Sequence, residues 1–105
     1  MAGKDRFAAV EWIARTDEVG VRINTLAAGE ATPWHFHSGV TDNVFCLEDG
    51  IEVGLRDPDS TRRMRPGERL EIPPGRVHRV ANRARRESRY LLVQATGRYD
   101  FNEVA

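Results

Sequence analysis

The chain has 105 residues, of which sixteen are basic and sixteen acidic, so its formal net charge at pH 7 is zero. This length favours one domain, predicted over residues 1–105, and a composition of 40% apolar and 30% charged residues is typical of a soluble globular protein. The balanced charge predicts no nucleic-acid or lipid partner, and no apolar run is long enough to span a bilayer.

The cysteine content and the N-terminal residues bear on location. Cys46 is the only cysteine, so an intramolecular disulfide and a cysteine-based zinc site are both excluded. The first residues, MAGKDRFAAVEW, lack the apolar segment of a secretory signal. We therefore expect a cytoplasmic protein.

Short segments rich in β-branched and aromatic residues alternate with Gly, Pro and Asp turn signals along the chain. The first fifteen residues fit either a short helical turn or a strand. Strands of this length and spacing are typical of an all-β sandwich or barrel. The segments that we expect to be strands are 19–26, 43–48, 51–55, 69–72, 76–82 and 90–95.

The segment TPWHFHSG, residues 32–39, contains two histidines separated by one residue. In an extended chain, His35 and His37 share one face, which suits two imidazoles that converge on one metal ion. The alternative is coincidence, with one ring in the core and one in solvent. Phe36 would face away from both rings, and Trp34 would either line the mouth of a cavity or pack elsewhere.

Alternation along residues 43–48 separates two faces. Asn43, Phe45 and Leu47 share one face, and the apolar character of Phe45 and Leu47 directs that face inward. Asn43 is then expected to point inward, and Phe45 and Leu47 to form the apolar wall of a ligand cavity. Cys46 lies on the opposite face and is best explained as a buried structural thiol.

Alternation along residues 76–82 places His78 on the face opposite Arg79, so His78 is expected to point inward. A buried polar group without a partner costs a few kcal/mol, and a metal ion or polar ligand would satisfy it. In the last strand, Gln94 shares a face with Tyr90, which fits either ligand contact or a surface position. The basic run 79–89 lacks interleaved aromatic residues, which favours a solvated hairpin over a nucleic-acid site.

Two motifs in residues 29–82 resemble those of the cupin superfamily. The segment GERLEIPPGRVHRVAN matches the second cupin motif at Gly67, Pro73, Gly75, His78 and Asn82. Gly29, His35 and His37 fit the first half of the first motif, and Gly50 fits its end. The chain is thus similar to a small single-domain cupin, and the resemblance implies a double-stranded β-helix, or jelly-roll barrel.

The resemblance also implies a metal centre. In cupins, two histidines of the first motif and one of the second bind a divalent ion, usually together with a glutamate. The corresponding residues here are His35, His37 and His78, which are all the histidines of the chain. We expect one divalent ion per chain, and Fe, Zn, Ni, Mn and Cu all accept imidazole ligands.

The chain departs from the motif at the glutamate. Counting back from Gly50 gives Asn43, and counting forward from His37 gives Asp42, because one residue has been added between them. The alternation argument favours Asn43, so the preferred prediction is a three-histidine site completed by Asn43 or water. Asp42 is the alternative fourth ligand, which a local bulge would bring to the site.

A site of three neutral imidazoles leaves the charge of the ion uncompensated, and this favours a small anionic organic molecule as ligand or substrate. The first hypothesis is a mononuclear metalloenzyme, with a dioxygenase as the leading subclass and an isomerase or lyase next. The alternative is a non-catalytic binding or sensor protein whose metal is mainly structural. A purely structural role for the histidines is the third possibility.

A small β-sheet leaves edge strands that need cover. Small cupins pair through such edges and through their outer apolar faces. The resemblance therefore implies a homodimer.

Overall fold

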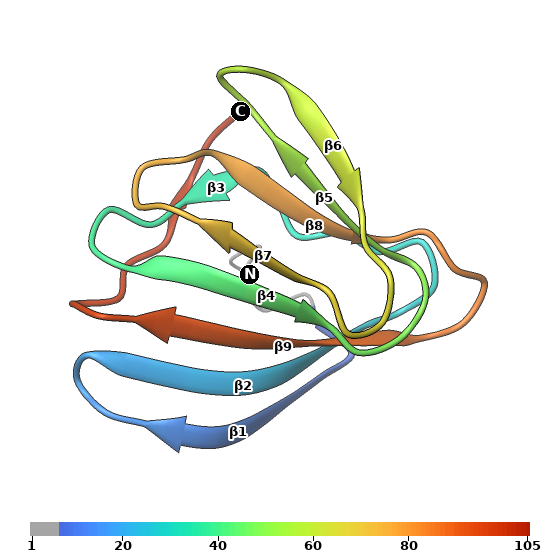
Figure 1. Cartoon of the computed structure of the whole chain (residues 1–105), viewed down its shortest axis with the longest axis horizontal. Helices are drawn as coiled ribbons and strands as arrows, with labels where there is room; N and C mark the ends of the chain where they lie inside the picture. The colour runs from blue at the N-terminus through green and yellow to red at the C-terminus, as the bar shows by residue number, and fades with distance from the viewer. Residues whose placement is uncertain (1–6) are drawn as a thin grey trace.

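Two five-stranded antiparallel sheets make up residues 7–105, the part of the chain that the computed structural model describes (Figure 1). The first sheet has the order β1-β2-β9-β4-β7 and the second has the order β10-β3-β8-β5-β6. No helix able to cross a membrane occurs among these residues. The strands are β1 (Ala9–Arg15), β2 (Val19–Leu26), β3 (His35–Phe36), β4 (Thr41–Cys46), β5 (Ile51–Leu55), β6 (Ser60–Arg63), β7 (Arg69–Ile72), β8 (His78–Asn82), β9 (Ser88–Ala95) and β10 (Asn102–Glu103).

The architecture is the all-β double-stranded β-helix that the sequence predicted. Strands β2, β5 and β7 coincide with predicted segments, β8 and β9 differ from theirs by two residues at one end, and β4 is displaced by two residues at both ends. The N-terminal segment forms strand β1 and no helical turn among its described residues. Strands β3, β6 and β10 were not predicted, because β3 and β10 have only two residues each and β6, with the sequence STRR, has no apolar side chain to show alternation.

Residues 79–89 do not form the predicted hairpin. Strands β8 and β9 belong to different sheets, so the connection between them crosses from one sheet to the other. Arg83, Arg85 and Arg86 lie on this connection and are all exposed, in agreement with its expected solvation.

The second motif folds as its residues require. Gly67 and Gly75 have φ angles of +92° and +82°, which glycine adopts without steric cost in the turns on either side of β7. The amide N–H of Gly75 donates a hydrogen bond of 2.8 Å to the carbonyl of His37, which ties the turn to the first motif. Asn82 is fully buried, and its side-chain amide donates to the carbonyls of Leu26, Ala27 and Arg86, as expected for a residue that fixes a strand end.

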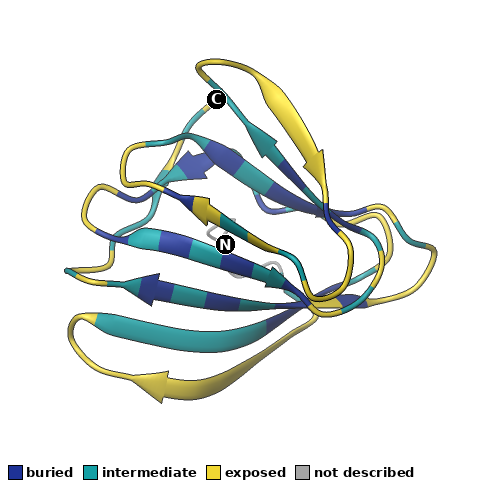
Figure 2. Ribbon diagram, viewed as in Figure 1, coloured by how far each residue is buried: buried dark blue, intermediate teal, exposed yellow. Residues whose placement is uncertain are grey.

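The hydrophobic core lies between the two sheets (Figure 2). Cys46 is 1% exposed within it, so the predicted buried thiol is confirmed. Both sheets contribute inward apolar side chains, namely Leu26, Val44, Cys46, Ile72, Tyr90 and Leu92 from the first and Ile51, Val53 and Val80 from the second.

The orientation predicted for residues 43–48 is wrong. Asp42, Val44 and Cys46 are the buried side chains of β4, while Leu47 is 37% exposed just beyond the strand. The side-chain oxygen of Asn43 accepts a hydrogen bond of 2.6 Å from Arg69 at an exposed position.

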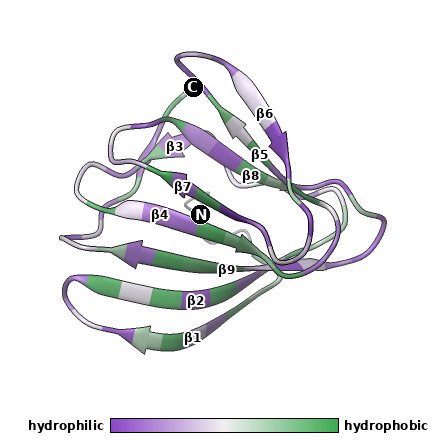
Figure 3. Ribbon diagram, in the orientation of Figure 1, coloured by the Kyte–Doolittle hydropathy of each residue, from purple (hydrophilic) through white to green (hydrophobic). Residues whose placement is uncertain are grey.

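The error has a physical cause in the composition of the first sheet. Its outer face is also apolar, since Phe45 pairs across the strands with Leu91, and Leu91 with Ile23. All three side chains are only partly buried. Figure 3 shows apolar residues along β2, β9 and β4. The burial pattern places them on both faces of these strands, so an apolar side chain does not by itself identify the core face.

The homodimer remains a prediction, and the outer face of the first sheet suggests where it would form. We call the side chains of Ile23, Phe45 and Leu91 the outer patch. Light scattering at micromolar concentration is expected to give the mass of a dimer, and Phe45→Glu to give a folded monomer, with an unfolding temperature that no longer depends on protein concentration. Ile13→Glu, on the exposed edge strand β1, is the matched variant. If only this second variant dissociates the dimer, the edge strand rather than the outer patch is the interface.

Candidate metal centre

The three histidines come together at one end of the barrel interior. His35 lies on β3 opposite His78 of β8, and His37 follows β3 on the same face as His35. Their ring centroids are 4.4 Å apart for His35 and His78, 5.0 Å for His35 and His37, and 5.5 Å for His37 and His78. All three are buried, and one ligand atom from each lies within 4.8 Å of the others. The predicted convergence of the three imidazoles is therefore present.

Each imidazole is oriented by a backbone carbonyl. Because a carbonyl oxygen only accepts, Nδ1 must carry the hydrogen, and in a neutral ring the Nε2 atom then presents its lone pair. Metal-binding histidines are commonly held in this way by a hydrogen bond from the second ring nitrogen. The acceptors are the carbonyl of Pro33 for His35 at 2.7 Å, of Asp100 for His37 at 2.6 Å and of Arg76 for His78 at 2.8 Å.

A carboxylate completes the cluster. Oδ2 of Asp42 lies 3.2 Å from Nε2 of His37 and 3.1 Å from Nε2 of His78. The side-chain amide of Gln94 donates to Oδ1 of Asp42 at 2.9 Å, so both carboxylate oxygens have partners. The residue at the glutamate position is thus Asp42, the alternative from the sequence, while Asn43 points away because β4 has the opposite register.

The pKa values of Asp42, His37 and His35 are shifted by their surroundings in different directions. Burial alone would raise the pKa of Asp42, but hydrogen bonds from His37 and His78 outweigh it and hold that pKa well below its usual range. Burial alone would lower the pKa of His37, but the bond to Asp42 reverses the effect and raises it. Burial, followed by the nearby His78, lowers the pKa of His35 to about 3. Asp42 is therefore anionic and His35 neutral near pH 7.

These residues fit a divalent metal ion. With neutral rings, the lone pairs of two Nε2 atoms face an anionic oxygen at about 3 Å, which is repulsive unless a proton or a cation lies between them. Ligand atoms about 2 Å from a shared ion stand about 3 Å apart, as these do. Imidazole and carboxylate are both common ligands of zinc, iron and related ions.

The C-terminal segment closes the site, and no motif in the sequence predicted this role. The ring of Phe101 stacks on His35 with centroids 4.4 Å apart, and Tyr99 lies 5.3 Å from His37. Asp100 supplies the carbonyl for His37, and its carboxylate accepts hydrogen bonds from the amide and hydroxyl of Ser38. Figure 1 shows this segment passing from β9 to the second sheet, where β10 pairs with β3. The alternating aromatic residues after β9 were the available signal.

The four predicted ligand-contacting residues divide into two groups. Gln94 is buried at the site beside Asp42 and His37. Trp34 instead packs against Gly54 on the outer face of the second sheet, between the guanidinium groups of Arg56 and Arg79 at 4.1 and 4.7 Å. It points outward because it alternates with His35 along the chain.

Phe45 and Leu47 also lie away from the metal centre. Their positions follow from the register of β4, which turns Asp42 inward and residues of the other parity outward. The predicted cavity wall is therefore wrong for these two residues. The inner cavity beside the histidines is instead lined by apolar side chains from several elements, namely Phe7, Val80, Tyr90, Leu92 and Phe101.

Comparison with known families agrees with this geometry. The sequence model of the family described as "Cupin domain" matches residues 22–94, which include all three histidines, Asp42 and Gln94. The chain belongs to the cupin family. A comparison with the sequences of characterised proteins finds no match.

Solved structures confirm the cupin fold at low sequence identity. Peruvianin-I, a cysteine peptidase from Thevetia peruviana latex, is 17% identical with a TM-score of 0.80, over 96% of this chain and 69% of that one. Recombinant oxalate oxidase in complex with glycolate is 20% identical with a TM-score of 0.78, over 92% of this chain and 55% of that one. The protein TT1209 from Thermus thermophilus is 23% identical with a TM-score of 0.73, over 84% and 82%. The cupin thus spans about half the length of the oxalate oxidase chain.

Substitutions at neighbouring positions test the fourth ligand. Asp42→Asn is expected to weaken binding of Zn²⁺ by at least about tenfold, because it removes the anionic oxygen next to two imidazoles. Asn43→Ala is the matched control and is expected to leave metal affinity unchanged, since Asn43 contacts Arg69. Competition with a chromophoric chelator measures both. Loss of affinity in the Asn43 variant alone would contradict the assignment.

The low pKa of His35 predicts acid sensitivity of the metal-free protein. Unfolded His35 takes up a proton below pH 6.5 and the folded form only near pH 3, so stability falls as pH drops between these values. The slope from one group is at most about 1.4 kcal/mol per pH unit. Between pH 6.5 and 4.5 the raised pKa of His37 contributes a constant stabilisation, and the lowered pKa of Asp42 does not yet matter.

Urea unfolding in the presence of a chelator measures this slope. His35→Phe keeps a ring against Phe101 and is expected to flatten the loss of stability across that pH range. An unchanged slope in the variant would show that His35 is not the buried neutral group responsible.

Proposed function

We propose that this cupin is a mononuclear metalloenzyme that binds one divalent ion and acts on a small organic anion. Dioxygenase chemistry is the leading subclass of this proposal. The observation that carries it is the convergence of three oriented imidazoles and the Asp42 carboxylate inside the barrel. Such a set holds the ion on one side and leaves coordination positions for a ligand.

The charge of the site supports an anionic ligand. The three imidazoles bring no charge when neutral and Asp42 brings one negative charge, so a divalent ion keeps a net positive charge there. A bound divalent ion supplies Lewis acidity to the oxygen atoms of a substrate. Ligands with anionic oxygen atoms are therefore bound most favourably by the positive charge at this site.

The residues of the chain have separate roles in this proposal. His35, His37 and His78 hold the ion, and Gln94 orients Asp42 through its hydrogen bond to Oδ1. Burial raises the pKa of Tyr99, although the nearby Arg22 works against the rise, so the phenol stays protonated near pH 7 and can donate a hydrogen bond to a ligand. The aromatic ring of Phe101 covers His35 and excludes water from that side.

A specific observation favours the alternative of a non-catalytic binding or sensor cupin. The inner cavity beside His35 and His37 has a volume of about 20 Å³, which suits about one water-sized group. A cavity of this size, covered by the C-terminal segment, leaves little space beside an ion, as expected when the ion is mainly structural.

Location and assembly belong to the same proposal. A reducing cytoplasm suits Cys46, which is a free buried thiol. A homodimer through the outer patch would cover the apolar outer face of the first sheet.

Metal analysis of the purified protein, followed by oxygen uptake, tests the proposed function. The panel contains β-dicarbonyl, thiol and catechol compounds, with glycolate and oxalate added because a similar fold binds glycolate. We expect iron-dependent oxygen consumption with at least one compound, lost in His78→Ala and retained in Asn43→Ala. Bound zinc or nickel with no turnover would favour the binding protein. Removal of metal with no effect on stability or ligand binding would contradict both functions.

A further inference from the structure

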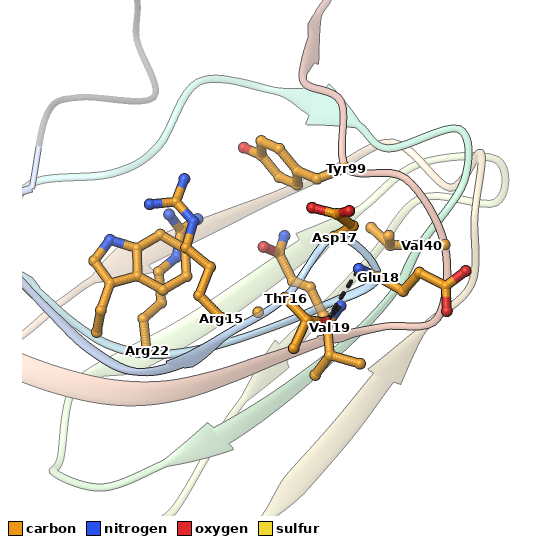
Figure 4. A pocket seen from close by; sticks show the side chains of 12 residues that line it. Arg15, Thr16, Asp17, Glu18, Val19, Arg22, Val40 and Tyr99 are labelled. Atoms are coloured by element: carbon orange, nitrogen blue, oxygen red, sulfur yellow. Dashed lines mark hydrogen bonds between the residues drawn. The ribbon is translucent and has the colours of Figure 1, made fainter.

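A second pocket lies next to the metal centre. This outer pocket has a volume of about 80 Å³ and is formed by the β1–β2 turn and the segment after β9 (Figure 4). Arg22 and Gln94 line both the outer pocket and the inner cavity that contains His35 and His37. These two side chains therefore form the wall between them, and a ligand that passes this wall reaches from the pocket to the metal centre.

Arg22 is incompletely satisfied at this wall. It lies on β2 between Trp12 of β1 and Leu92 of β9, with its side chain on the inner side of the sheet. Its Nε atom is buried and has no hydrogen-bond partner, although the guanidinium has a hydrogen bond with the side chain of Tyr99. No carboxylate among residues 7–105 forms an ion pair with it. A partly buried guanidinium that lacks an anion is costly and is stabilised when a carboxylate binds it.

The charges around the outer pocket are arranged on two sides. The guanidinium carbons of Arg15 and Arg22 lie 4.1 and 5.1 Å from the ring of Trp12. Figure 4 shows these two groups on one side of the pocket, the carboxylate of Glu18 on the other, and the carboxylate of Asp17 between them in this view. The lining carries two cationic and two anionic side chains, so an anion is attracted only at the side that holds Arg22 and Trp12 and is repelled near Asp17 and Glu18.

The floor of the outer pocket leaves room for a ligand. A Cβ atom on Gly20 would come within 3.3 Å of the Trp12 ring and 4.0 Å of Oε1 of Gln94, so a side chain there would fill the space. The amide nitrogen of Gln94 is used by Asp42. Its Oε1 atom remains on the side of Gly20, where it can accept a hydrogen bond from a ligand hydroxyl.

We infer that the outer pocket is a carboxylate subsite, in which Arg22 pairs with the carboxylate of a small bifunctional ligand. The other end of that ligand carries the oxygen donors that reach the metal centre past Gln94. The inference rests on the proposed function and narrows its ligand class to small organic acids with a second, metal-binding group. Arg22 is thus the residue that selects for the carboxylate.

Two hydroxamates that differ at one end provide the test. Butyrohydroxamate and succinate monohydroxamate carry the same metal-binding group, and a carboxylate in the second replaces the methyl of the first. In Trp34→Phe the fluorescence comes from Trp12 alone, because the chain has two tryptophans, and Trp12 lines the outer pocket. With zinc-loaded protein, we expect the carboxylate compound to bind at least about tenfold more tightly.

Variants on the Trp34→Phe background assign this preference to a residue. Arg22→Gln is expected to abolish the preference and leave binding of butyrohydroxamate unchanged, and Arg22→Lys to retain part of it, because lysine keeps the charge without the planar fork. Arg15→Gln is the matched control, since it removes the other guanidinium beside Trp12, and should keep the preference. Equal affinities in the Trp34→Phe protein, or a preference that survives Arg22→Gln, would overturn the inference.

A metal-free arm separates this inference from the proposed function. If neither hydroxamate binds the zinc-loaded protein, the proposed ligand-accessible metal centre fails. The subsite is then judged with succinate and metal-free protein, where quenching of Trp12 that is lost in Arg22→Gln supports it. No quenching by succinate in that arm overturns it.

Discussion

The candidate metal centre depends on the orientation of three imidazole rings by three backbone carbonyls. Each Nδ1 atom donates to a carbonyl, and each Nε2 atom is thereby directed to one point inside the barrel. Two of the carbonyls lie two residues before their own histidines, at Pro33 and Arg76, so local chain geometry places them. The third belongs to Asp100, and it reaches His37 only because the C-terminal segment returns to β3. The metal centre is therefore a product of the whole barrel and not of its two motifs alone.

The Asp42 carboxylate supplies the negative charge of the cluster. Burial disfavours the protonated form of an imidazole, and three neutral imidazoles would leave the full charge of a bound divalent ion uncompensated. Asp42 lies beside two of them, stays anionic, and would reduce the charge of a bound divalent ion without cancelling it. Its second oxygen is held by Gln94, and Gln94 in turn forms part of the outer pocket. A ligand that contacts Gln94 from the outer pocket would therefore act on the position of the carboxylate that we propose as a metal ligand.

The sequence predicted what depends on local patterns and failed where distant parts of the chain decide. His78, Asn82 and the glycine turns follow from a motif whose residues set their own turns and register, and their predicted positions are confirmed. The face of residues 43–48 depends on what covers the outside of the first sheet. The prediction for Phe45 and Leu47 is wrong because it equates apolar character with burial. The roles of Asp100 and Phe101 come from a return of the chain over more than sixty residues, which alternation within a strand does not reveal.

Along the inner face of the first sheet, the side chains change from packed core residues at one end to polar site residues at the other. The core and the site therefore occupy opposite ends of the same barrel. Residues paired across β2, β9 and β4 form rows on this face, and successive rows are two residues apart along each strand. Three such rows lead from the packed core to the polar site. The rows are Asn24, Tyr90 and Cys46, then Arg22, Leu92 and Val44, then Gly20, Gln94 and Asp42. The first row belongs to the buried interior, the second carries the guanidinium, and the third reaches the histidines. Since side chains repeat every second residue, a register shift of one residue on any of these strands would remove core and site together. The hydrophobic core therefore fixes the register on which the polar site depends.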